Sequence, residues 1–350
     1  MKVRLRILVT SSFRITEPTL GRQRIIKVRV AVVLSLFVVV IAMANLIPSR
    51  AQEARVAGQQ PPPNGVPPLN PLKVALLKWY PANLTTSFKV GDNPYSLAFD
   101  GANMWVSNNG DNTVTKLRAN DGEVLGTFPV GGAPMGLAFD GANIWVVNSF
   151  PNTVTKLRAS DGKNLGEFAV GQVPFFAAFD GEAIWVTNTQ GNSITKLRAS
   201  DGKLLGRFTD NDAPIDIIFD GTYMWVTNGV GTVSRYTVDG KPAGTFKLNV
   251  GLLTLTFDGA NIWVPDGGNI IKMRASDGRV LATYNVGADG SGIAFDGVDL
   301  WFTAGAYIGV MRPTDGKVLL ARRLGGVEGI AFDGANIWVA DWQFDLVHKL

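Results

Sequence analysis

The chain has no cysteine and only one histidine in 350 residues. Without cysteine, neither disulfide bonds nor thiolate chemistry can contribute to the fold or to a site. The histidine, His348, stands in the position that Thr155 holds in an internal repeat described below. Since the sequence shows no evident partner for it, we do not expect it to act as a catalytic base.

Long apolar runs are also missing, except near the start of the chain. Eight lysine and arginine residues and one acid, Glu17, precede the run from Ala31 to Ala44, and Ser49-Arg50-Ala51 follows it. This order is typical of a secretory signal peptide. We therefore predict a signal peptide over residues 1–51, and a chain that is exported to the periplasm or the cell exterior. The alternative is an uncleaved, outward-facing anchor in which only residues 30–47 contact the membrane.

The exported part lacks an excess of basic charge. Residues 52–350 hold 24 lysine and arginine residues against 28 acids, a net charge of 24 − 28 = −4. Such a domain has no basic field that would attract nucleic acid, so we expect no nucleic-acid partner. Residues 52–83 are rich in proline and glutamine and predict an extended linker. Residues 84–350 remain as one folded, monomeric domain.

One eight-residue unit organises this domain. Phe-Asp-Gly-Ala-Asn-Ile-Trp-Val at 139–146 returns unchanged at 257–264 and 332–339, and in altered form from Phe99, Phe179, Phe219 and Phe295. The seven phenylalanines are spaced by 40, 40, 40, 38, 38 and 37 residues. Repeats of this length stack on their neighbours because none can bury its apolar face alone.

Each repeat predicts four short strands. In residues 134–170 the strands are 135–139, 144–148, 153–159 and 164–170, and Asp-Gly turns follow the first and third. Asp-Gly between β-branched and aromatic residues is a strong hairpin signal. Seven such units predict an all-β, seven-bladed propeller of four-stranded antiparallel blades.

The two ends of this domain complement each other. The last repeat has strands at 328–332, 337–341 and 346–350 but no fourth, whereas the segment 85–90 precedes the first repeat and resembles the fourth strand 125–130. We predict that 85–90 pairs with the last blade and removes its open edge.

The repeats resemble a known family. Trp-Val-Thr-Asn at 185–188 and 225–228, and Thr-Val-Thr-Lys-Leu-Arg at 113–118 and 153–158, are similar to YVTN-type propellers of exported bacterial proteins, within the NHL-like superfamily. The resemblance covers 85–350. It implies a seven-bladed propeller that acts as a surface or periplasmic binding module.

Three residue types recur too regularly to mark a site. The seven tryptophans predict core wedges between blades, and the seven Phe-Asp-Gly aspartates predict turn residues that bond their own backbone. The Lys-x-Arg pairs, such as Lys116 and Arg118, predict side chains paired with nearby aspartates. A tryptophan stacking ring, a cation-binding aspartate ring and a polyanion-binding basic stripe are the alternatives.

The repeats differ on one face, which collects the second-to-third and blade-to-blade loops. Exposed aromatic residues on loops commonly mark recognition. The candidate partner-binding residues on this variable-loop face are Tyr95, Met135, Phe150, Phe175, Phe176, Trp342 and Phe344.

A second hypothesis uses the acids near the same face. The segment from Leu300 to Thr303 resembles repeats of the streptogramin lyases, seven-bladed enzymes that use a histidine with magnesium, but no histidine stands at a matching inner position. A metal-assisted lyase or hydrolase would instead bind Ca²⁺ or Mg²⁺ through oxygen ligands. The candidate ligands are Asp210, Asp212, Asp216 and Glu328.

The leading hypothesis is therefore an exported, non-catalytic propeller without a cofactor. It would bind a protein, a glycan or a component of the cell envelope through the variable-loop face.

Overall fold

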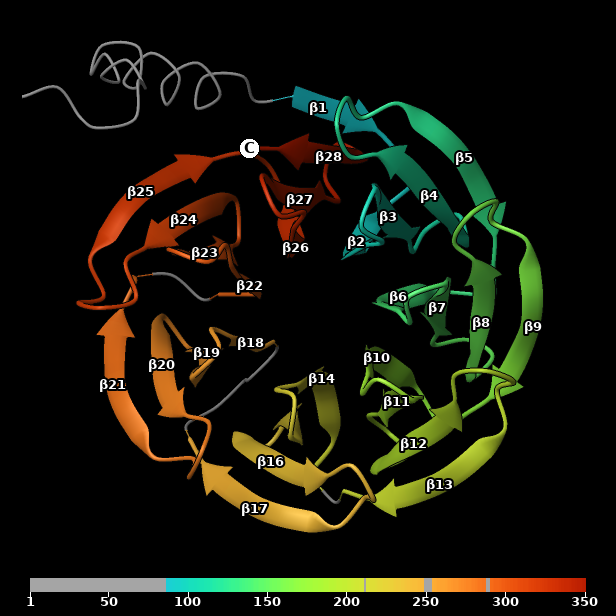
Figure 1. Cartoon of the computed structure of the whole chain (residues 1–350). Coiled ribbons are helices and arrows are strands. Elements are labelled where there is room, and N and C mark those ends of the chain that lie inside the picture. Colours follow the sequence, from blue (N-terminus) through green and yellow to red (C-terminus); the bar gives the residue numbers. More distant parts are fainter. Residues whose placement is uncertain (1–85, 211, 249–253, 288–289) are drawn as a thin grey trace, which may run out of the picture. The chain divides into compact units, whose positions relative to one another are not determined.

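The computed structural model describes residues 86–210, 212–248, 254–287 and 290–350. In these ranges the chain forms seven four-stranded antiparallel sheets, arranged as blades around a common axis (Figure 1). The predicted all-β, seven-bladed propeller is thereby confirmed. The predicted signal peptide and linker lie outside the described residues. Within the described part, no helix has the length and apolar character needed to cross a bilayer.

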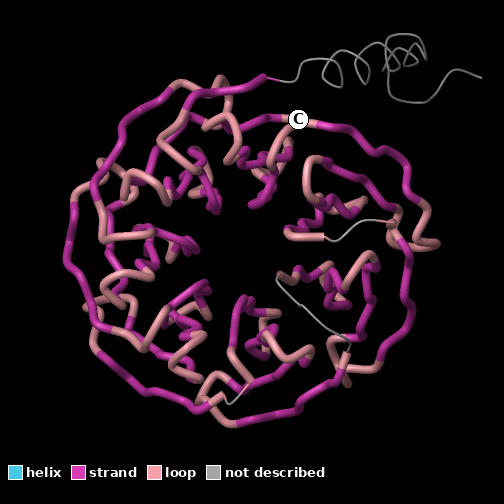
Figure 2. The backbone as a smooth tube through the Cα atoms, turned by 180° about the vertical axis from the view of Figure 1, so that it is seen from behind, coloured by secondary structure: helices cyan, strands magenta, loops and turns pink. Residues whose placement is uncertain are grey.

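The strands lie in four concentric layers (Figures 1 and 2). The innermost are β2 (Pro94–Phe99), β6 (Pro134–Phe139), β10 (Pro174–Phe179), β14 (Pro214–Phe219), β18 (Thr256–Phe257), β22 (Gly292–Phe295) and β26 (Val327–Phe332). The second are β3 (Asn103–Asn108), β7 (Asn143–Asn148), β11 (Ala183–Asn188), β15 (Tyr223–Asn228), β19 (Asn261–Asp266), β23 (Leu300–Ala304) and β27 (Ile337–Asp341). The third are β4 (Thr113–Arg118), β8 (Thr153–Arg158), β12 (Ser193–Arg198), β16 (Thr232–Thr237), β20 (Asn269–Arg274), β24 (Tyr307–Met311) and β28 (Leu346–Lys349). The outermost are β5 (Val124–Pro129), β9 (Asn164–Ala169), β13 (Leu204–Thr209), β17 (Pro242–Lys247), β21 (Val280–Asn285), β25 (Val318–Arg323) and β1 (Thr86–Lys89).

The strand β1 belongs to the seventh blade although it precedes the first. It pairs antiparallel with β28, with Thr86 opposite Lys349 and Lys89 opposite Leu346. The ring of Phe88 stacks on Trp338 with 5.7 Å between ring centroids. The seventh blade is thus built from segments at both ends of the described chain.

The tryptophans of the second strands form the core, as predicted. Six of the seven are completely buried, and Trp301 is half-buried. Each indole N–H donates to the aspartate of its own Phe-Asp-Gly turn, as from Trp145 to Asp140 over 2.8 Å. The same aspartate accepts two backbone N–H groups of its turn, from Ala142 and Asn143. The hydrogen bonds of these aspartates therefore stabilise the blade, as the predicted turn role implies. The additional bond to tryptophan was not predicted from the sequence.

The glycine of the third-to-fourth turn makes a contact between blades that recurs around the ring. Gly162 has a φ of 74°, a conformation that favours glycine. A Cβ atom there would lie 2.0 Å from the ring of Phe128 in the preceding blade. That ring in turn lies 5.6 Å from the ring of Trp105. Glycine is therefore required both by the turn and by the packing of the neighbouring blade.

The lysines of the third strands correct one prediction. Lys156 is buried and donates to the backbone carbonyls of Ala199 and Ser200 in the next blade, over 2.6 and 3.1 Å. Its ammonium group lies 5.0 Å from the ring centre of Trp145. In this second-blade pair only Arg158 is exposed and paired with an aspartate, Asp161, as predicted. The lysine is a clamp between blades, because the buried carbonyls offer it charge-assisted hydrogen bonds.

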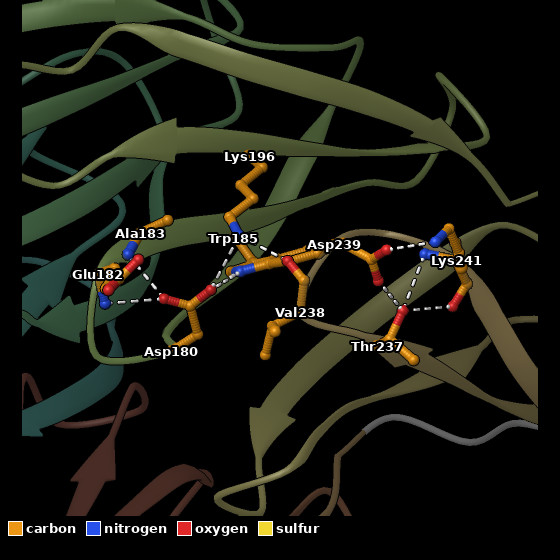
Figure 3. A network of polar contacts seen from close by, with 9 residues as sticks. All are labelled: Asp180, Glu182, Ala183, Trp185, Lys196, Thr237, Val238, Asp239 and Lys241. Atoms are coloured by element: carbon orange, nitrogen blue, oxygen red, sulfur yellow. Dashed lines mark hydrogen bonds and ion pairs between the residues drawn. The ribbon is translucent and has the colours of Figure 1, made fainter.

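Figure 3 shows this clamp between the third and fourth blades. The Lys196 ammonium donates to the carbonyl of Val238 over 2.6 Å and pairs with Asp180 over 3.2 Å, while Asp180 also accepts the Trp185 N–H. Equivalent basic side chains, each bonded to carbonyls of the next blade, are Lys116, Lys156, Arg235, Lys272 and Lys349. The sixth blade has Val310 in this position.

Candidate functional site

The variable-loop face is formed by two sets of loops that hydrogen-bond to each other. In the second blade Phe150 N–H donates to the Gly132 carbonyl over 3.0 Å, and in the seventh Trp342 N–H donates to the Gly326 carbonyl over 2.9 Å. In the first four blades and the seventh, the second-to-third loop therefore lies against the blade-to-blade loop that precedes it. Side chains on these loops have fixed backbone support.

Three of the predicted partner-binding residues are exposed on these loops. Phe150 is 74% exposed, Trp342 49% and Phe344 52%. The indole ring of Trp342 lies against Gly326, where a Cβ atom would come within 2.6 Å of it. The structure thus presents these aromatic groups to solvent, two of them on one loop of the seventh blade and one on the second blade.

The other aromatic candidates lie at the centre of the ring. Tyr95, Phe175 and Phe176 pack together, with ring centroids 6.2 Å apart for Tyr95 and Phe175 and 5.5 Å apart for the two phenylalanines. Met135 is separate from them: its sulfur accepts a hydrogen bond from the Asn109 amide over 3.1 Å. The seven predicted residues therefore fall into three groups. Three are exposed on loops, three pack together at the centre of the ring, and Met135 contacts the loop residue Asn109.

The three central rings line a cavity of about 210 Å³ around the propeller axis. Residues on or next to the innermost strands of all seven blades contribute to its wall. Two predicted metal ligands, Asp216 and Glu328, line the same cavity. The structure thus joins residues that the sequence assigned to two competing hypotheses.

These two acids differ in their hydrogen bonds. The Asp216 carboxylate accepts the backbone N–H of Ile217 over 2.8 Å and that of Leu255 over 3.2 Å. Burial nevertheless raises the pKa of Asp216 to about 7. Burial also raises the pKa of Glu328 above its ordinary value. Among the described residues, no hydrogen-bond or ion-pair partner approaches the Glu328 carboxylate.

The remaining two acids serve the joint between the third and fourth blades. The Tyr236 hydroxyl donates to Asp210 over 2.8 Å, and Asp210 also accepts the backbone N–H of Asp212. Asp212 accepts the Thr232 hydroxyl over 3.0 Å. Burial raises the pKa of Asp210, against the opposing effect of the Tyr236 hydrogen bond.

The four candidate ligands therefore separate into a central pair and a loop pair. In the described parts of the chain, no three histidine or acidic side chains gather closely enough to hold one metal ion. Calcium requires 6–8 oxygen ligands, and two carboxylates supply only part of that number.

His348 has partners that the sequence did not reveal, so the expectation that it stands alone is wrong. Its Nε2 lies 2.9 Å from Asp341 Oδ2, and its Nδ1 lies 2.8 Å from the Ser87 hydroxyl. Ser87 belongs to β1, which precedes the first repeat in the chain. Only the pairing of β1 with β28 brings the three residues together.

This Ser-His-Asp set contains the residue types of a hydrolase triad, but its position is that of a structural chain. In the first blade Asn108, Thr115 and Thr127 occupy the same three strands and are linked in the same order, over 2.9 and 3.4 Å. Ser87 lies on the outermost strand and does not line the central cavity. We therefore assign the set to the cohesion of the seventh blade.

Comparison with known proteins supports the fold. No protein-family model and no curated protein sequence matches the chain. Hydrazine synthase from Kuenenia stuttgartiensis is a similar solved structure, with a TM-score of 0.67, 18% identity and coverage of 75% of this chain and 97% of that chain. A streptogramin B lyase structure has a TM-score of 0.64, 22% identity and coverage of 76% of this chain and 96% of that chain. At these identities the likeness shows the propeller fold alone.

Proposed function

We propose that this protein is an exported, non-catalytic propeller that binds a protein, a glycan or another component of the cell envelope through its variable-loop face. The observation that carries the proposal is the exposure of Phe150, Trp342 and Phe344 on backbone-supported loops. The first and third repeats have Gly110 and Gln190 where the second has Phe150. The scaffold therefore does not require an aromatic ring there, and exposed aromatic anchors typically dominate interface energies.

Export is the second part of the proposal and rests on the sequence of residues 1–51. If the signal is cleaved after Ala51, the mature chain begins at Gln52. The mass of the chain recovered from the producing cell distinguishes cleavage from an uncleaved anchor over residues 30–47. We also propose that the chain is a YVTN-type propeller whose ring is closed by the pairing of β1 with β28, and the register of Thr86–Lys89 against β28 supports this.

The experiment replaces Phe150, Trp342 and Phe344 together with serine. Capture of envelope components on the immobilised protein should fall at least tenfold, since each aromatic anchor contributes about 2 kcal/mol or more at an interface. A matched control replaces three residues of the outermost strands that are 40–50% exposed, namely Val124, Leu205 and Val280.

The control variant should capture the same components as the unaltered protein. Equal capture by the loop variant and the unaltered protein would place the binding surface elsewhere. No observation on the described residues favours the metal-assisted lyase or hydrolase, so we do not propose it. A rise in melting temperature on addition of Ca²⁺ or Mg²⁺ would reopen that hypothesis.

A further inference from the structure

The repeats differ from one another at the wall of the central cavity. In four of the innermost strands, β2, β10, β14 and β26, the second and third residues line the cavity, and these four strands carry four different pairs there. The first repeat has Tyr95-Ser96, the third Phe175-Phe176, the fourth Ile215-Asp216 and the seventh Glu328-Gly329. A scaffold alone does not need this variety, because the Phe-Asp-Gly end of the same strands stays constant.

One wall of the cavity is aromatic. Tyr95 contacts both phenylalanines, at 6.2 Å from the Phe175 ring centre and 6.3 Å from that of Phe176. The rings come from the first and third blades and meet across β6, where the repeat has Gly136. A Cβ atom on Gly136 would lie 2.7 Å from Phe176, so this glycine makes room for the aromatic wall.

Two acids flank the aromatic wall. Asp216 lies on the fourth blade, next to the blade of the two phenylalanines, and Glu328 lies on the seventh blade, next to that of Tyr95; among the described residues, no lysine, arginine or histidine lines the cavity. Burial raises the pKa of Tyr95, and the charges of Glu328 and Asp216 raise it further, so both carboxylates act on the aromatic wall. Two partly desolvated carboxylates without a compensating cation are costly in a folded protein.

We propose that the central cavity binds a small organic cation, a compound with a substituted ammonium group. Its charge would compensate Asp216 and Glu328, while its alkyl groups would lie on the faces of Tyr95, Phe175 and Phe176. Aromatic rings attract ammonium groups through the negative potential of their faces, and aromatic cages are a common way to recognise quaternary ammonium ligands.

Other occupants fit less well. A hydrated divalent ion would find two carboxylates and an apolar remainder, too few oxygen ligands for calcium. An anion would meet two acids and, among the described lining residues, no basic side chain. A cavity of about 210 Å³ is smaller than the 300–1,000 Å³ typical of drug-sized ligands, so the ligand is small.

The test compares choline with its uncharged analogue 3,3-dimethylbutan-1-ol by isothermal titration calorimetry on the full domain. The two probes have nearly the same shape and differ by the positive charge. Choline should bind with a Kd of about 1 mM or tighter, and the alcohol at least tenfold more weakly. Choline should also bind more tightly at pH 8 than at pH 5, since burial raises the pKa of Asp216 to about 7 and that of Glu328 above its ordinary value, so protonation at the lower pH removes the charge that the cation would meet.

Two variants locate the site. Glu328→Gln keeps the shape but removes the charge, and Phe176→Leu removes part of the aromatic wall; each should weaken choline binding at least fivefold. The control Glu182→Gln removes the same charge from an exposed turn on the opposite face and should leave binding unchanged. Equal affinity for choline and the alcohol, no saturable choline binding below about 10 mM, or loss of binding in the control would each overturn the proposal.

This inference is independent of the partner proposed for the loops. The triple-serine loop variant should retain choline binding, and Glu328→Gln should retain capture of the envelope partner. Failure of one proposal can therefore be told from failure of the other.

Discussion

The two ends of the same strands have opposite characters. At the Phe-Asp-Gly end all seven repeats keep the aspartate, the glycine and the tryptophan whose indole N–H the aspartate accepts. At the variable-loop end the four innermost strands whose second and third residues line the central cavity carry four different pairs. The constant end satisfies buried polar groups inside each blade, whereas the variable end borders solvent and the central cavity. Constancy among the repeats therefore accompanies a structural role here, and the divergent end is where we propose recognition.

The largest expected effect comes from removing β1, the strand that precedes the first blade and completes the seventh. Deleting residues 86–89 exposes the edge of β28 and leaves Trp338 without the stacked ring of Phe88. Unpaired strand edges template association between chains, so the deletion should yield aggregates on size-exclusion chromatography.

The control deletes residues 55–70, which lie in the predicted linker before β1. This deletion should leave a monomeric domain with an unchanged melting temperature. A monomeric β1 deletion that melts like the full domain would contradict the proposed closure.

The second prediction sets two tryptophans against each other. Trp145→Ala, at the constant end, should destabilise the domain by about 3–5 kcal/mol, because it opens a cavity between blades and leaves Asp140 without a donor. Trp342→Ala, on the loop face, should cost about 0.5 kcal/mol or less. Denaturant unfolding of both variants provides the comparison, and similar losses would remove the distinction between the two ends.

The third prediction separates two basic residues of one strand. Lys156→Met keeps the apolar stem but loses the hydrogen bonds to Ala199 and Ser200, which should cost about 1.5–3 kcal/mol. Arg158→Met loses an exposed ion pair with Asp161 and should cost about 0.5 kcal/mol or less. Equal stability of the two variants would show that the buried lysine adds nothing to the joint between the blades.

The last prediction concerns Asp216 in the central cavity, whose effect on stability appears only as a change with pH. The folded-state pKa of Asp216 is about 7, above its ordinary 3.8, so the native state holds a proton that the unfolded state releases. Stability must therefore fall as the pH rises from about 4 to about 7. Asp216→Asn cannot titrate, so its melting temperature relative to that of the unaltered domain should rise by a few degrees between pH 4 and pH 8. A constant difference across this range would show that Asp216 is already ionised at pH 4.

The sequence predicted the repeat architecture and strand positions to within about one residue, because an Asp-Gly turn and a buried tryptophan recur in every unit. It could not predict how side chains from different blades meet. Tyr95 and Glu328 are 233 positions apart in the chain, and only the ring places both at one cavity. The partners of His348 were missed for the same reason, since Ser87 lies on a strand from the other end of the domain.

The lysine clamps were misassigned because a Lys-x-Arg pair looks the same whether one or both members reach solvent. Their side chains lie on the same strand face, yet Lys156 is buried under the next blade while Arg158 extends past it. How deeply a side chain is buried between two blades depends on the tertiary structure. The alternation of residues along a strand predicts only which face a side chain is on, not how deeply it is buried.

The clamps also bear on how such a ring could grow from a shorter ancestor. Every described clamp ends on backbone carbonyls of the following blade, as Lys116 does on those of Ala159 and Ser160, and backbone atoms are the same whatever the side chains are. The basic side chain of a duplicated blade could therefore bond to the backbone carbonyls of any following blade without a compensating substitution there. Once inserted, its residues at the axis and on the loops would be free to change. Because the clamp bonds backbone carbonyls, which do not depend on the side chains, blades could be duplicated first and their axial and loop residues could change afterwards.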